Sequence, residues 1–366
     1  MDQLNMAQPG GEKTMNRPIG TITVFLESTG TQMRIFDMGR RIGKISRDSF
    51  LKFEKTELAY PYPVQQQAWF ALLFQDSKQH REPTVWFLRF PLDEQGKLLQ
   101  AARDDFMHRL LERVGENLQA AQEGSQLDTA LKDNPYTYKP RDEHMAVFHA
   151  KAAQLFKQPP SKYFEHARDY FSGKLGWDQW GFLGYQGVAE IALCQSQKEI
   201  NKMLVTAIPH LPAKPLEALC RCLENETINL AINQALLDRL DRILSETPTD
   251  TQQVAACIRG VACSQSQQLK KASVERVLEH PCATSPDILA AISGRCWEML
   301  LDDRIRRLYL ERLAVNDQGQ LFFDQCMSDL LFIPGLRAPL LSSIRDPERS
   351  EELSNAIGAL FQRLNG

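Results

Sequence analysis

Residues 254–262 read VAACIRGVA, and their pattern decides the larger part of this fold. Apolar residues stand at positions 254, 257, 258, 261 and 262, which is the i, i+3, i+4, i+7, i+8 spacing of one helix face. Similar patterns recur from residue 142 to the end, joined by short connections that often hold one proline. No strand pattern competes with them, so these helices must bury their apolar faces against other helices.

The helical region also carries a loose internal repeat. Segments of small residues around Val188, Ala218, Ala255 and Ala290 recur every 30–37 residues, which is close to the helix-pair unit of HEAT-like arrays. We therefore expect residues 142–366 to form an all-α, HEAT-like irregular α-solenoid. A compact helical bundle is the alternative.

The first third of the chain mixes strand and helix signals. Residues 32–37, 41–46, 67–75 and 84–90 are typical of strands, and residues 97–123 have helical periodicity. The β-propensity of residues 21–25 favours a strand, but apolar spacing and a terminal glycine favour a short helix over 19–30. The sequence predicts an α+β domain over 19–123, a small mixed or antiparallel sheet with helices. It predicts a disordered tail over 1–18 and a proline-containing linker over 124–141.

Composition excludes several classes of protein. The formal charge is −3 and 43% of the residues are hydrophobic, so the chain is an ordinary globular one without a global attraction for nucleic acid. The longest apolar run, residues 68–74, is far shorter than the roughly 20 residues that span a bilayer. We expect a cytoplasmic protein with no membrane association, and the sequence does not indicate an oligomeric state.

No motif for catalysis, cofactor binding or metal binding is present. The chain lacks the zinc-protease, phosphate-loop, dinucleotide and nucleophile-elbow patterns, so we predict no catalytic, cofactor or metal residues. All cysteines lie in the second half without a CxxC pair, which favours buried, reduced thiols. They are Cys194, Cys220, Cys222, Cys257, Cys263, Cys282, Cys296 and Cys326.

A basic segment is the first candidate binding surface. Residues 34–55 hold seven basic and three acidic residues. Arg40 and Arg41 follow a glycine turn, where exposed guanidiniums could bind a phosphate or a carboxylate, and Arg34 and Lys44 lie on either side. A solvated edge strand that uses charge to block aggregation explains the same pattern.

A glycine-rich aromatic segment, residues 173–187, is the second candidate. It contains Trp177, Trp180 and Tyr185 among five glycines. Large aromatic side chains beside flexible backbone can anchor a ligand or a partner protein. Packing between helices is the competing explanation for the same residues.

A set of short motifs, taken together, resembles a known family. The motifs are FDMGRRI at 36–42, PYPVQ at 61–65, WFLRFPLDEQG at 86–96, NPYTY at 134–138, MAVFHA at 145–150 and GW at 176–177. In this combination they are similar to an uncharacterised bacterial family of domains of unknown function, family 3549, of gammaproteobacterial type. The resemblance covers residues 19–366 and implies no activity, cofactor or catalytic residue.

These observations lead to a ranked set of functional hypotheses. A helical array with a long surface and no catalytic cluster favours a non-enzymatic protein-interaction or scaffold protein, whose partner is another protein. Binding of nucleic acid or a phosphate ligand through residues 34–55 is the alternative. An enzyme whose site is assembled from distant, unrecognised residues is the third.

Overall fold

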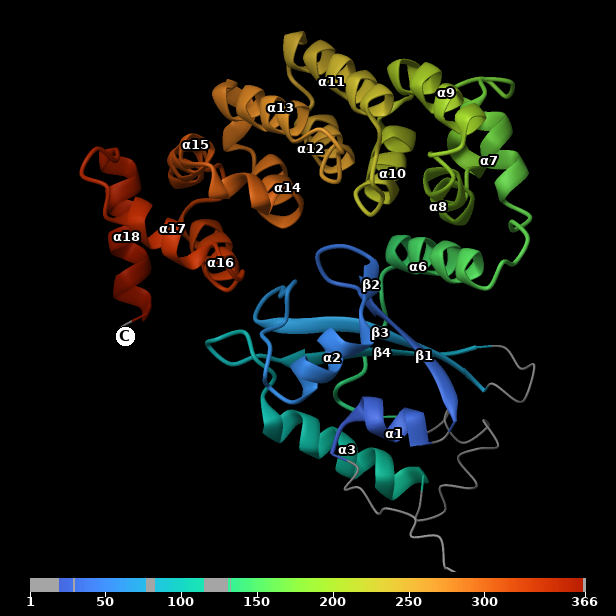
Figure 1. The fold of residues 1–366 in the computed structure, drawn as a ribbon. Helices are drawn as coiled ribbons and strands as arrows, with labels where there is room; N and C mark the ends of the chain where they lie inside the picture. Colours follow the sequence, from blue (N-terminus) through green and yellow to red (C-terminus); the bar gives the residue numbers. More distant parts are fainter. Residues whose placement is uncertain (1–19, 29, 77–82, 115–130, 132, 365–366) are drawn as a thin grey trace, which may run out of the picture.

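The computed structural model describes residues 20–28, 30–76, 83–114, 131 and 133–364, and the predicted tail over 1–18 lies outside them. The amino-terminal part combines a sheet with helices, and the described residues from 142 onward are mostly helical (Figure 1). The elements of the amino-terminal part are α1 (Ile22–Ser28), β1 (Thr31–Asp37), β2 (Gly43–Ile45), α2 (Arg47–Glu54), β3 (Gln67–Asp76), β4 (Thr84–Pro91) and α3 (Gln100–Val114).

Within the described residues, four strands form one antiparallel sheet in the order β2-β1-β3-β4. Side chains alternate between the two faces of a strand. Ile35 and its partner Leu72 belong to the core that the sheet shares with α1, α2 and α3. Phe36 and its partner Ala71 belong to the core that continues into the helical part. The sheet is therefore a layer between two sets of helices, and the predicted small antiparallel sheet is confirmed.

Helix α1 is short and depends on a residue from another helix. The Glu54 carboxylate, at the end of α2, accepts hydrogen bonds from the backbone amides of Ile22 (2.6 Å) and Thr23 (3.2 Å). A carboxylate at the start of a helix satisfies free amides and complements the helix dipole. Burial nevertheless raises the pKa of Glu54 to about 7.

The helical part begins with α6 (Asp142–Leu155), which packs on the sheet. The ring of Phe148 on α6 meets Phe36 at 5.4 Å and Phe87 at 5.3 Å between centroids, both edge to face. The α-helices that follow are α7 (Phe164–Phe171), α8 (Tyr185–Leu193), α9 (Lys198–Ala207), α10 (Ala213–Leu223), α11 (Leu230–Ser245), α12 (Thr251–Gly260), α13 (Gln267–Glu279), α14 (Pro286–Arg295), α15 (Asp303–Ala314), α16 (Gln320–Leu331), α17 (Arg337–Ile344) and α18 (Glu351–Leu364).

Most of these helices contact their next-but-one neighbours. The inner row runs α6, α8, α10, α12, α14, α16, and each of these helices contacts the next in the row. The outer row runs α7, α9, α11, α13, α15 with the same kind of contact. Figure 1 shows both rows curving as an arc, with the inner row toward the sheet.

The predicted helices are confirmed where the structure describes them. Residues 22–28 are helical, so the helix alternative for 19–30 is correct. Helix α3 covers part of the predicted 97–123 helix, whose residues 115–123 lie outside the described ones. Past residue 142 the described chain holds helices and no strand ladder, only an isolated bridge between Ile228 and Ser264.

The end of the predicted linker lies along the sheet. The Arg89 amide donates to the Tyr136 carbonyl at 2.8 Å, and the Tyr138 amide donates to the Phe87 carbonyl at 3.2 Å. The Tyr138 ring packs edge to face on Trp69, with 4.8 Å between centroids. Residues 136–138 thus pair with the outer edge of β4 before α6 begins.

Close packing of α7 against α8 requires a glycine. A Cβ atom at Gly187 would stand 2.5 Å from the Tyr163 carbonyl oxygen and 2.9 Å from the Ala167 Cβ. Neither neighbour is the flexible end of a long side chain. Gly187 therefore sets the distance between the two helices.

We predict that Gly187→Ala destabilises the fold by about 1–3 kcal/mol, because the added methyl group forces the α7 backbone away. Gly358→Ala is the matched control, since a Cβ there meets nothing within 4 Å and α18 should gain about 1 kcal/mol. Urea unfolding of both variants measures the difference. Equal stabilities would show that α7 and α8 are not this close.

Candidate functional site

The loop between β1 and β2 is the first candidate site, because it carries Arg40 and Arg41. Residues 38–42, the docking loop, extend from the sheet toward the inner row of helices (Figure 1). The loop passes close to residues 61–64, since a Cβ atom at Gly39 would lie 3.1 Å from Cγ2 of Val64. The Ile42 amide donates to Oδ1 of Asn225, just past α10, at 2.7 Å.

Arg40 is enclosed, with 1% of its surface exposed. Its Nη2 atom lies 2.7 Å from Oδ2 of Asp329 on α16. Its Nε donates to the Pro63 carbonyl at 2.8 Å, and its Nη1 donates to the Ser293 carbonyl on α14 at 3.3 Å. A buried guanidinium is stable only when it is paired and its donors are satisfied, and these partners meet that condition.

Arg41 lies beside Arg40 and is half-buried. Its guanidinium carbon stands 4.4 Å from the centre of the Trp297 ring, a cation–π contact. Its Nη2 donates to the Arg295 carbonyl at 3.1 Å and forms an ion pair with Glu298 at 2.7 Å. A longer contact, 3.5 Å, reaches the carbonyl of Ala262, just past α12.

The carbonyl acceptors share a position in the fold. Ser293 and Arg295 end α14, and Ala262 follows the end of α12. The last carbonyls of a helix lack partners within it and carry the negative end of its dipole, so they attract cations. The docking loop therefore brings two positive charges to the carbonyl groups at the ends of the inner-row helices.

The sequence suggested that Arg40 and Arg41 are exposed, and this is wrong for Arg40, which is buried, and for Arg41, which is engaged on Trp297. The carbonyl groups at the helix ends that accept hydrogen bonds from these two arginines lie more than 220 residues away along the chain. Arg34 and Lys44 are exposed on the sheet, and Arg34 donates to the neighbouring Met33 carbonyl. The four basic residues do not form one open surface.

A buried carboxylate holds the start of the docking loop. Asp37 accepts a hydrogen bond from the Tyr60 hydroxyl at 2.6 Å and another from the Arg41 amide at 3.1 Å. Burial raises the pKa of Asp37 to about 7, against the lowering effect of these hydrogen bonds. Burial and the neighbouring Asp37 also raise the pKa of Tyr60.

The predicted aromatic residues separate into packed and exposed ones. Trp177 is packed, because its ring stacks on His210 at 5.8 Å between centroids and meets Tyr170 edge to face at 5.9 Å. Trp180 and Tyr185 are exposed, by 41% and 40%. Packing therefore explains Trp177, and a free surface remains at the other two.

Two more rings complete the exposed group. Phe182, on the short 3-10 helix Gln179–Phe182, is 83% exposed. Tyr163 is also exposed, and its ring lies 3.6 Å from the place of a Cβ at Gly184. We call Tyr163, Trp180, Phe182 and Tyr185 the aromatic surface. Helical periodicity could not predict Tyr163, since it belongs to a different segment.

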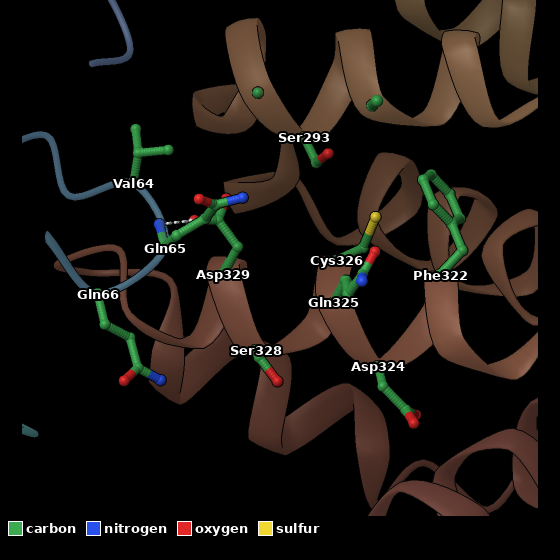
Figure 2. A pocket seen from close by; sticks show the side chains of 12 residues that line it. Val64, Gln65, Gln66, Ser293, Phe322, Asp324, Gln325, Cys326, Ser328 and Asp329 are labelled. Carbon is green, nitrogen blue, oxygen red and sulfur yellow. Dashed lines mark hydrogen bonds between the residues drawn. The ribbon is translucent and has the colours of Figure 1, made fainter. Parts of the chain in front are cut away.

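A pocket at the other end of the inner row has no precedent in the sequence patterns. Its volume is about 560 Å³, and it lies between the turn at Gln65 and Gln66 and the helices α14 and α16 (Figure 2). The backbone amide of Gln65 donates to Oδ1 of Asp329 at 2.9 Å, and Oδ2 of Asp329 is paired with Arg40. Asp329 therefore connects the pocket to the docking loop. The three consecutive glutamines at 65–67 carry no recognisable signal.

Among the described residues, no group of three or more His, Cys, Asp and Glu side chains could hold a metal ion. The eight cysteines are free, and five of them are buried, as expected for thiols that pack as small apolar groups. No helix among the described residues is both long and apolar enough to cross a membrane.

Comparison with known proteins agrees with the resemblance in the motifs. A family model described as "Protein of unknown function (DUF3549)" matches residues 17–361, and the chain belongs to this family. No curated protein and no solved structure matches it. The function of the chain is therefore unknown, and any function has to be argued from its own residues.

We predict that Arg40→Ala lowers the free energy of unfolding by about 2–5 kcal/mol, because it leaves Asp329 and two carbonyls without their donor. Arg40→Lys should lower the free energy of unfolding less, since lysine keeps the positive charge but lacks the several N–H donors of the planar guanidinium. Arg34→Ala, at an exposed position, should change it by no more than about 0.5 kcal/mol. Urea unfolding compares the three variants, and equal effects of Arg40→Ala and Arg34→Ala would contradict the docked arrangement.

We predict that Asp37 makes the fold less stable as the pH rises. Its pKa is about 7 in the folded protein against an ordinary 3.8, so its contribution is complete below about pH 4 and lost through about pH 7. The difference in unfolding free energy between the natural protein and Asp37→Asn should fall with pH in this window, by at most about 1.4 kcal/mol per unit. Glu54, whose pKa is also raised, is present in both proteins, so its contribution to the pH dependence cancels in this difference. A difference that rises with pH would mean that the Asp37 pKa is lowered.

Proposed function

We propose that this protein is a non-enzymatic interaction or scaffold protein that binds another protein through the aromatic surface. The single observation that carries the proposal is the exposure of Trp180, Phe182 and Tyr185, which are close in sequence, together with Tyr163, whose ring lies against Gly184. Exposed apolar groups that gather on one surface are typical of interaction sites, and Trp and Tyr are enriched among the residues that dominate binding energy.

The helical part is, in this proposal, an irregular α-solenoid of the HEAT-like kind. Next-but-one contacts along an inner and an outer row support it, because stacked helix pairs contact only their neighbours. Such an array offers a long surface to partners without needing a catalytic cluster. A closed bundle would not continue these contacts from α6 to α16.

The rigidity of the support strengthens the case for the aromatic surface. Gly187 holds α7 and α8 together beneath it, and Trp177 fixes the preceding segment by stacking on His210. The Tyr170 hydroxyl donates to the Trp177 carbonyl at 2.9 Å. Rings on a rigid support lose little conformational entropy on binding, which favours affinity.

We also propose that the protein works in the cytoplasm. Eight free cysteines, with Cys194, Cys263 and Cys282 partly exposed, are compatible with a reducing compartment. Burial raises the pKa of each of these three thiols, which lowers their reactivity.

We predict that the double substitution Trp180→Ala and Phe182→Ala abolishes partner binding. Each ring that anchors a partner contributes about 2 kcal/mol or more, so losing both should weaken binding by at least about a hundredfold. Affinity capture from a lysate of the native host, followed by quantitative mass spectrometry, measures which proteins are lost.

Leu230→Ala is the matched control, since Leu230 is 59% exposed on α11, away from the aromatic surface. Both variants should keep the unfolding midpoint of the natural protein, because the substituted side chains are exposed. A protein retained by the natural chain and by Leu230→Ala but lost by the double variant supports the proposal. Identical capture by all three proteins contradicts it.

A further inference from the structure

The pocket in Figure 2 has the size of a ligand site. Its volume of about 560 Å³ lies within the range of about 300–1,000 Å³ that small-molecule sites occupy. One wall is the turn that contains Gln65 and Gln66, and the other walls are α14 and α16. It is separate from the aromatic surface, which belongs to the α7–α8 end of the array.

The turn in the pocket wall is strained. Val64 and Gln67 exchange two backbone hydrogen bonds of 3.1 Å, so Gln65 and Gln66 form a two-residue hairpin turn. Both have left-handed backbone, with φ of 51° and 59°. Such turns normally use Asn-Gly, and each side chain held in this conformation costs about 1 kcal/mol or more. The result is that two amide side chains, instead of glycines, stand at the pocket.

The carboxylates of the pocket are already compensated. Asp329 is paired with the buried Arg40 and accepts a hydrogen bond from the backbone amide of Gln65. Asp324 is paired with Arg363 at 2.7 Å and accepts from the Gln320 side chain at 2.6 Å. With both charges neutralised within the fold, the pocket does not favour a charged ligand.

The unused polar groups of the pocket are neutral. Within the described residues, no hydrogen bond uses the side-chain amides of Gln65, Gln66 and Gln325 or the Ser328 hydroxyl. A glutamine amide can donate and accept at once, which matches the N–H and C=O of a peptide group.

In the rest of the lining, the Ser293 hydroxyl already donates to the Leu289 carbonyl, and the other residues are apolar or open. Val64, Ala290 and Phe322 contribute apolar surface. Gly294 on α14 lies at the pocket, and a Cβ atom there would meet nothing within 4 Å. Apolar walls beside free amides fit an apolar side chain together with the peptide groups that flank it.

We propose that this pocket binds an uncharged peptide segment of a partner protein. An apolar side chain of the segment fills the space at Gly294, and the amides of Gln65, Gln66 and Gln325 bond its backbone. Recognition is neutral, so the affinity does not depend on salt, in contrast to binding through phosphate contacts. The pocket stands independently of the aromatic surface.

Gly294→Leu tests the proposal, because Gly294 lines the pocket, a Cβ atom there meets nothing within 4 Å, and the new side chain takes up space that a ligand would use. Gly358→Leu is the matched control, at a helical glycine that is equally open. The probe is the best binder selected by the natural protein from a display library of short random peptides that includes charged residues. Fluorescence anisotropy then gives its affinity for each protein at low and at high salt.

We expect selection to favour uncharged peptides with one apolar residue at a fixed place. Gly294→Leu should weaken binding by at least about tenfold, and Gly358→Leu should leave it unchanged. Gln325→Ala, an exposed position on α16, should weaken it by about three- to tenfold through the loss of one hydrogen bond. The double variant Trp180→Ala and Phe182→Ala should bind the peptide like the natural protein, which separates this site from the proposed function.

Three results would overturn the proposal. The first is a selection that enriches no peptide, and the second is an enriched peptide that binds Gly294→Leu as tightly as the natural protein. The third is a neutral oligosaccharide on a glycan array that binds the natural protein and is lost with Gly294→Leu. That result would assign the pocket to a polyhydroxylated ligand instead of a peptide.

Discussion

The guanidinium of Arg40 joins parts of the chain that are 289 residues apart, and much of the architecture depends on it. Its partners come from the segment before β3, from α14 and from α16, so all three must be in place before the charge is satisfied. An unpaired buried charge costs several kcal/mol, so the contacts of Arg40 stabilise the sheet against the inner row of helices. Arg41 extends the same contact to Trp297 and to the end of α14.

Local periodicity predicted the elements of this fold well. The helices past residue 142 and the four strands follow from spacing and composition, because each depends on residues that are near in sequence. The position of Arg40 does not, since a loop arginine looks the same in sequence whether it faces solvent or the end of a distant helix. The sequence indicated a charged turn, and only the tertiary contacts decide that Arg40 is buried.

The candidate sites show the same division. The glycine-rich segment with Trp177 and Trp180 could be identified from composition, but which ring packs depends on His210, a residue some thirty positions away. The pocket at Gln65 could not be identified at all. Its walls come from three separate segments of the chain, and the left-handed backbone of its turn lacks the glycine that normally marks such a turn.

The docking loop touches the inner row near the ends of α10, α12, α14 and α16. A stacked helical array is elastic by nature, because small rotations between neighbours add up along its length. Here one short loop contacts several successive helices of the inner row and so links them to one another. The curvature cannot change at one of these contacts without straining the others, so we expect the inner row to resist bending more than a row of helices without such a loop.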